Sequence, residues 1–132
     1  MDPIRIKETC LYVNDLKRTR EFYERVLGLE TFSYSEGGHV FFRVQYCVLL
    51  CFLSSNSKYK NNLPPHYGEG NLHFAFDTTR SSYDEWREKV VDAGVSIEHD
   101  HIWPGGFRSF YFRDPDQHCV EILEEGMWEY RK

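Results

Sequence analysis

Two carboxylates and one imidazole lie in short runs that are otherwise typical of buried β-strands. Glu8 lies within IKETCLYVNDL, His73 within NLHFAFDT and Glu121 within HCVEILE. An ionised side chain is rarely placed in a buried strand unless it is paired or bound to a metal ion. The three residues are therefore candidates for acid–base chemistry or metal binding. Hydrogen bonding, or simple solvation in an open groove, is the structural alternative.

The elements that would position these residues occur twice along the chain. In the first half, a strand at the start of residues 6–16 precedes a helix and three strands, predicted at 14–28, 29–34, 39–44 and 46–52. The second half repeats this order, with a strand, a helix and three strands at 71–78, 81–94, 95–102, 108–114 and 118–124. A duplication of this kind predicts an α+β fold of two βαβββ modules.

Both predicted helices carry start and stop signals. Asn14 is a suitable N-cap for the first helix, and Gly28 stands where a C-terminal glycine belongs. Ser82 and Glu85 are spaced as a capping box for the second helix, which Gly94 ends. Apolar spacing predicts the buried face of the first helix to be Leu16, Thr19, Phe22, Tyr23, Val26 and Leu27.

The repeat relates the three polar residues to one another. Superposing the first strands of the two modules places Glu8 on His73, and both side chains face away from the helix, because alternate residues of a strand point to opposite faces. Glu121, in the last strand, is predicted on that same concave side. Aligning CVLLC with CVEIL makes Leu49 its counterpart in the first module.

The predicted modules set the domain organisation. We expect residues 1–132 to form a single domain, with module one at about 4–53 and module two at about 71–124. The segment between them, about 54–70, is polar and rich in turn-forming residues, so we expect a linker.

The composition excludes several classes of protein. With 41% hydrophobic and 17% aromatic residues, the chain can bury a core. Lys and Arg total 16 against 21 Asp and Glu, for a net charge of −5, which argues against a nucleic-acid partner. The longest apolar run, 47–53, is too short to span a membrane. No secretory signal is evident, and the four cysteines form no CxxC pair, so a cytoplasmic protein is expected.

Three segments make the chain resemble the vicinal oxygen chelate superfamily, which includes glyoxalase I, bleomycin resistance proteins, extradiol dioxygenases and fosfomycin resistance enzymes. They are LYVNDLKRTREFYERVLGLE, HFAF and RSFYFRDPDQHCVEIL, and the likeness extends over about residues 4–124. The resemblance implies that the two modules pair into a cup-shaped, barrel-like mixed sheet with helices outside. It also implies a divalent metal ion on the inner wall.

The ligand positions of this superfamily correspond here to Glu8, Leu49, His73 and Glu121. Leu49 cannot bind a metal ion, and Glu8 stands where the fosfomycin enzymes have a histidine. The implied ligands are therefore Glu8, His73 and Glu121. Two carboxylates favour Mn²⁺ or Mg²⁺, and the imidazole keeps Zn²⁺, Ni²⁺ and Fe²⁺ open. Glu8 has an alternative role as a hydrogen-bonding group or a base beside a metal-free pocket.

Such a ligand set favours Lewis-acid chemistry on a small substrate that chelates the metal through adjacent oxygens. We expect an isomerase, lyase or related enzyme, with Glu8 and Glu121 catalytic. An extradiol dioxygenase fits less well, because that group uses two histidines and one carboxylate. The alternative is a non-catalytic drug- or metabolite-binding protein of the bleomycin resistance type, with which three Trp and nine Tyr are compatible.

Three further residues are expected to contact the substrate. Ser109 and Tyr111 correspond to a Ser and a Tyr that touch the substrate in the fosfomycin enzymes, and Trp103 lies in a WPGG loop suited to covering a cup. Core packing is the alternative for Tyr111, and an ordinary hairpin loop is the alternative for Trp103.

Two more predictions concern metal and partners. His99 and His101 place two imidazoles on one face of a predicted strand, which could bind a metal ion or lie on a solvated edge. The resemblance implies a homodimer whose ligand is a small molecule. From the charge balance and the short apolar runs, we expect neither nucleic acid nor membrane as a partner.

Overall fold

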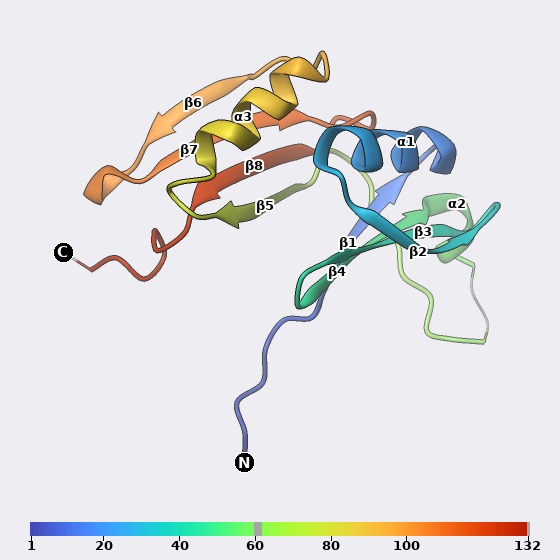
Figure 1. Ribbon diagram of the computed structural model, residues 1–132. Coiled ribbons are helices and arrows are strands. Elements are labelled where there is room, and N and C mark those ends of the chain that lie inside the picture. Colours follow the sequence, from blue (N-terminus) through green and yellow to red (C-terminus); the bar gives the residue numbers. More distant parts are fainter. Residues whose placement is uncertain (60–61, 132) are drawn as a thin grey trace. The chain divides into compact units, whose positions relative to one another are not determined.

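The chain divides into two compact units in the computed structural model, which describes residues 1–59 and 62–131 (Figure 1). The first unit runs from Met1 to Gly70, and the second begins at Asn71. Residues 60 and 61, which belong to the predicted linker, and residue 132 lie outside the described residues.

The described residues of the first unit form one sheet, one long helix and one short helix. Its elements are β1 (Glu8–Val13), α1 (Leu16–Leu27), β2 (Glu30–Ser35), β3 (His39–Val44), β4 (Cys47–Leu53) and α2 (Ser54–Ser57). The strand order is β1-β4-β3-β2, in which β1 pairs parallel with β4 and the other neighbours pair antiparallel. Helix α1 contacts β2, β3 and β4 and so covers one face of this sheet.

The second unit repeats this plan. Its elements are β5 (His73–Thr78), α3 (Tyr83–Asp92), β6 (His99–Ile102), a 3-10 turn (Pro104–Gly106), β7 (Arg108–Arg113) and β8 (Cys119–Glu124). The strand order β5-β8-β7-β6 again contains one parallel pair, β5 with β8. The predicted α+β class and the two βαβββ modules are confirmed, and each sheet is open at both edges rather than closed into a barrel.

Helix α1 buries the face that the helical spacing predicted, namely Leu16, Thr19, Phe22, Tyr23, Val26 and Leu27. Its N-cap is Asp15 and not Asn14, so that prediction was wrong. The Asp15 carboxylate accepts a hydrogen bond from the backbone N–H of Arg18 at 3.0 Å, which is the reach of an N-cap side chain to the third helical residue. Gly28 ends the helix in the left-handed conformation, at φ 67°, as predicted.

The predicted capping box of α3 does not form, although the position of the cap was right. Ser82 is the N-cap residue, but its side chain makes no capping hydrogen bond, and its backbone is helical (φ −98°, ψ −7°) where a side-chain cap needs an extended residue. The hydroxyl of Thr79 instead accepts the N–H of Ser82 at 3.2 Å. Gly94, at φ 84°, follows the last turn as predicted.

Strand β6 is shorter than the predicted strand at 95–102. Only His99–Ile102 pair with β7, while residues 95–98 are irregular. Strand β6 lies at the edge of its sheet and has β7 as its one neighbour. Before β6, the backbone N–H of Glu98 still donates to the Tyr111 carbonyl oxygen at 2.7 Å, so the contact with β7 begins one residue before the strand.

The described part of the predicted linker folds back on the first sheet. After α2, the Nδ1 atom of His66 lies 2.9 Å from the Tyr12 hydroxyl, and its ring packs edge-on against Phe52 with the centroids 4.5 Å apart. A Cβ added at Gly68 would come within 2.7 Å of the Tyr12 ring, so only glycine fits there without a shift. These contacts tie the segment to β1 and β4.

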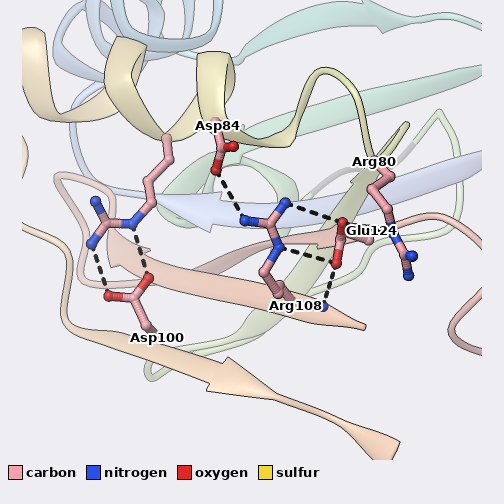
Figure 2. A network of polar contacts seen from close by, with 6 residues as sticks. Arg80, Asp84, Asp100, Arg108 and Glu124 are labelled. Carbon is pink, nitrogen blue, oxygen red and sulfur yellow. Dashed lines mark hydrogen bonds and ion pairs between the residues drawn. The ribbon is translucent and has the colours of Figure 1, made fainter. Parts of the chain in front are cut away.

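A buried carboxylate joins the second sheet to α3. Glu124 is 1% exposed and accepts hydrogen bonds from the backbone N–H of Arg108 at 2.7 Å and from its guanidinium at 3.3 Å (Figure 2). The guanidinium of Arg80 lies 3.2 Å from the same carboxylate. Arg108 also donates to Asp84 of α3 at 3.0 Å, so one arginine links helix and sheet.

These contacts set the charge state of Glu124. Burial, the largest single influence, raises the pKa of Glu124, but the hydrogen bonds from Arg108 and the charges of Arg108 and Arg80 together lower it below its usual value of 4.5. A carboxyl group whose pKa is lower in the folded than in the unfolded state stabilises the fold above the unfolded value. That stabilisation is lost as the pH falls through the folded value.

We predict that Glu124→Gln lowers the free energy of unfolding at pH 7 by about 1–3 kcal/mol, because charged hydrogen bonds in a buried site are lost. The variant should also lose part of the wild-type decline in stability below about pH 4.5. Urea denaturation at several pH values measures both effects. Glu88→Gln, the same change at an exposed site on α3 beyond its first turn, is the control and should shift stability by no more than about 0.5 kcal/mol. Equal stability of the Glu124 variant and the wild type at pH 7 would contradict the prediction.

Candidate functional site

Strand register gathers polar side chains on the face of the second sheet that α3 does not cover. In the ladder, Ala75 lies opposite Glu121 and His73 lies opposite Cys119, so alternation places the His73 and Glu121 side chains on the same face. Tyr111 is the β7 partner of Glu121. We call this surface the polar face of the second sheet; it comprises His73, Glu121, Tyr111, Ser109, His99 and His101.

The His73 imidazole is oriented towards the Glu121 carboxylate. Its Nδ1 atom lies 2.9 Å from the backbone carbonyl oxygen of Cys119, and because a carbonyl oxygen can only accept, Nδ1 must donate. In the neutral imidazole this leaves the lone pair on Nε2, which lies 3.3 Å from Oε1 of Glu121. A ring N–H donated to a backbone carbonyl is the usual support of a metal-binding histidine.

The Glu121 carboxylate is buried and only partly satisfied. The residue is 5% exposed, and its Oε2 atom has no hydrogen-bond partner among the residues that the structure describes. A buried carboxylate oxygen without a partner is costly, and a bound cation is one means of compensating for it. A buried carboxylate oxygen beside an imidazole nitrogen is a donor set that suits a divalent metal ion.

Tyr111 borders this pair. Burial raises the pKa of Tyr111 above its ordinary value of 10, the neighbouring Glu121 carboxylate raises it further, and a hydrogen bond with Ser109 lowers it. The net effect is upward, so the phenol stays protonated at neutral pH and can donate a hydrogen bond.

Trp103 and Ser109 are joined by a hydrogen bond. The indole Nε1 atom of Trp103 donates to the hydroxyl of Ser109 at 2.9 Å, and the Trp103 ring lies 4.4 Å from that of His101. Ser109 is 0% exposed, and its hydroxyl forms hydrogen bonds with both Trp103 and Tyr111. The side chains of Trp103 and Tyr111 are half-buried. A tight turn follows Trp103, whose backbone N–H donates to the carbonyl of Phe107 at 2.7 Å, as in an ordinary hairpin loop.

Glu8 belongs to the first unit, where it is exposed at the start of β1 opposite Val48 of β4. It shares its side of the sheet with Cys10, the pKa of whose thiol is raised by burial and by the Glu8 charge. The structure thus brings together His73, Glu121, Tyr111, Ser109 and Trp103 in the second unit and places Glu8 in the other unit.

The counterpart of Glu121 in the first module is Leu50 and not Leu49. The pairing of the last two strands shows which residues are equivalent in the two modules. Arg43 lies opposite Val48 in the first module and Arg113 lies opposite Cys119 in the second, so Val48 is equivalent to Cys119. Counting from these pairs places Leu50 at the position of Glu121. Leu49 is 2% exposed and lies on the α1 face. The predicted alignment was wrong by one residue, because the turns before the last strands differ in length, and one residue of slip reverses the face.

Sequence patterns did not predict the two hydrogen bonds that orient His73 and Trp103. The Cys119 carbonyl that orients His73 and the indole N–H that reaches Ser109 depend on register and loop geometry. The only available signal was the repeat, which locates the strands but not their hydrogen bonds.

The imidazole–carboxylate pair has no third ligand within its own unit. Among the described residues of the second unit, no third His, Cys, Asp or Glu side chain joins His73 and Glu121 to form a cluster.

No helix within residues 1–59 and 62–131 is long and apolar enough to cross a membrane.

Residues 5–122 match the model of the Glyoxalase/Bleomycin resistance protein/Dioxygenase superfamily, and the chain belongs to this superfamily. The fold is similar to that of a lactoylglutathione lyase from Agrobacterium tumefaciens, with a TM-score of 0.92 and 35% identity over 98% of this chain and 100% of that one. The sequence is 27% identical to the glutathione transferase FosA of Serratia marcescens over 118 residues, or 89% of this chain and 78% of the relative.

A more distant structure shares the fold. It is a point mutant of the genomically encoded fosfomycin resistance protein FosX from Listeria monocytogenes, complexed with Mn(II) and a dihydroxypropylphosphonic acid. Its TM-score is 0.66, with 24% identity over 92% of this chain and 90% of that one.

We predict opposite shifts in the pKa of Tyr111 from two substitutions. Glu121→Gln should lower the pKa because a neighbouring negative charge is removed, and Ser109→Ala should raise it because a hydrogen bond that lowers it is lost. NMR titration of tyrosine labelled at the ring carbon bearing the hydroxyl measures both, and Tyr111→Phe assigns the signal. Shifts in the same direction in the two variants would show that the environment of Tyr111 is not as described.

Proposed function

We propose that this protein is a divalent-metal-dependent enzyme of the lyase or isomerase kind, acting on a small substrate that chelates the metal through adjacent oxygens. The observation that carries the proposal is the buried, unpartnered Oε2 atom of Glu121 beside an oriented His73. The similarity to a lactoylglutathione lyase, at 35% identity over nearly the whole chain, supports this reaction class.

His73 and Glu121 would hold the ion, and Glu8 is the proposed third ligand because it occupies the equivalent of the His73 position in the first module. The third ligand comes from the same chain or from a second copy of it. Mn²⁺, Mg²⁺, Zn²⁺, Ni²⁺ and Fe²⁺ all suit one imidazole and two carboxylates. A bound ion of this kind supplies Lewis-acid stabilisation of negative charge that develops on a substrate oxygen.

The remaining residues would bind the substrate and move protons. The Tyr111 hydroxyl, which is protonated at neutral pH, would donate a hydrogen bond to a substrate oxygen beside Glu121. The half-buried Trp103 ring would form a flat wall, and the buried Ser109 hydroxyl would fix its orientation. The carboxylates of Glu8 and Glu121 are the groups we propose to accept and return a proton.

A second candidate function is the binding of an aromatic drug or metabolite without catalysis. It is favoured by an aromatic cluster on the first sheet, where His39 stacks on Phe41 at 3.9 Å and Phe41 meets Phe52 at 5.4 Å. In that case, ligand binding would be lost in Phe41→Ala and kept in Glu121→Ala. The homodimer and the cytoplasmic location are further parts of the proposal.

We predict about one divalent ion per chain in protein purified without a chelating tag, and its loss in both His73→Ala and Glu121→Ala. Titration with Mn²⁺ followed by elemental analysis measures this. Glu125→Ala, which removes an exposed carboxylate just after β8, is the matched control and should bind like the wild type. A wild type that contains no metal and takes up no added Mn²⁺ would remove the basis of the enzyme proposal.

We also predict that Glu121→Leu leaves the metal-free protein equally stable or makes it more stable, by up to about 2 kcal/mol, because a buried carboxylate without a full set of partners is replaced by an apolar group. The same variant should lose the stabilisation that saturating Mn²⁺ gives the wild type, which is about 2.7 kcal/mol at a hundredfold excess over Kd. Thermal unfolding with and without metal separates the two effects. A strongly destabilised metal-free variant would mean that Glu121 has a structural role.

A further inference from the structure

The edge strand β6 carries a second pair of metal-binding side chains, apart from His73 and Glu121. His99 and His101 alternate along the strand and are both exposed on the polar face of the second sheet. The Nε2 atom of His99 lies 3.3 Å from the Nδ1 atom of His101. Tyr111 lies between this pair and His73, with its ring centroid 5.8 Å from that of His99 and 6.2 Å from that of His73.

The separation of the two nitrogens suits a shared metal ion. Two imidazole nitrogens bound to one tetrahedral Zn²⁺, each at about 2.0–2.1 Å, lie roughly 3.3–3.4 Å apart. Without an ion, one of the facing nitrogens must carry a hydrogen to avoid the repulsion of two lone pairs. A divalent cation can replace that hydrogen and use both lone pairs.

Neighbouring contacts hold the pair in place before any ion binds. The His101 ring packs against Trp103, whose indole is bonded to the buried Ser109. On the opposite side of β6, Asp100 accepts two hydrogen bonds from Arg87 of α3, at 2.9 and 2.8 Å. The strand is therefore fixed to both β7 and α3, and binding a cation would order few additional groups.

We propose that His99 and His101 form a second cation site, which takes a divalent ion that favours nitrogen ligands, such as Cu²⁺, Ni²⁺ or Zn²⁺, with water in the remaining positions. A site with imidazole donors alone excludes Mg²⁺ and Ca²⁺, which require oxygen ligands. The expected order of affinity is Cu²⁺ above Ni²⁺ and Zn²⁺. This inference goes beyond the proposed function and does not depend on it.

Trp103 provides a direct readout, because Cu²⁺ quenches the fluorescence of a nearby indole and the His101 ring lies 4.4 Å from that of Trp103. The experiment is a Cu²⁺ titration of the full chain carrying His73→Ala, which removes the first site. We expect quenching that saturates with one ion per chain. In this background, His99→Ala and His101→Ala should each raise the Cu²⁺ concentration required by at least about tenfold, since loss of even an outer-shell partner costs 10–100-fold in affinity.

Two controls make the result specific. His66→Ala removes one imidazole from the first unit and should leave the quenching unchanged. Trp103→Phe should abolish the optical signal while elemental analysis still finds one bound Cu²⁺. Saturable quenching that is the same with and without His99 and His101, or the absence of quenching in the His73→Ala protein, would overturn the proposal. Neither outcome bears on Mn²⁺ binding by the wild type, so the two proposals can fail separately.

Discussion

The parallel pairing of the first and last strands of the second module is the constraint on which the candidate site depends. Because β5 and β8 lie side by side in register, His73 is held against the carbonyl of Cys119 and beside Glu121. The antiparallel partner β7 then brings Tyr111 opposite Glu121, and Ser109 supports Trp103. A one-residue slip of β8 would move Glu121 to the α3 face and put Val120 or Ile122 in its place.

The two modules share this ladder but differ in its chemistry. In the first module the same pairing places Glu8 opposite Val48, and Leu50 occupies the position of Glu121. The first sheet therefore carries Glu8 and an aromatic cluster, whereas the second carries the imidazole–carboxylate pair. The two faces of a sheet are packed separately, so the residues on the face away from the helix differ between the modules while both modules keep a helix-facing core.

Much of the fold follows from sequence patterns with a clear physical cause. The repeat predicted both modules, and apolar spacing predicted all six buried residues of α1. Predictions that depend on side-chain geometry and strand register were less accurate. Asn14 and Asp15 are both good capping residues, and the chain path decides between them. The alignment of Leu49 with Glu121 ignored the turn length, which sets the register. The burial of Ser109 beneath Trp103 depends on a loop conformation that sequence patterns do not specify.

The most direct test of metal binding by His73 and Glu121 is a crystal structure of the protein soaked with Mn²⁺ or Zn²⁺, with the ion located by anomalous scattering. We expect an ion at about 2.0–2.2 Å from both Nε2 of His73 and a carboxylate oxygen of Glu121. A structure that has no ion at these atoms at saturating metal, and in which Oε2 of Glu121 is hydrogen-bonded to another part of the protein, would contradict the proposed metal site.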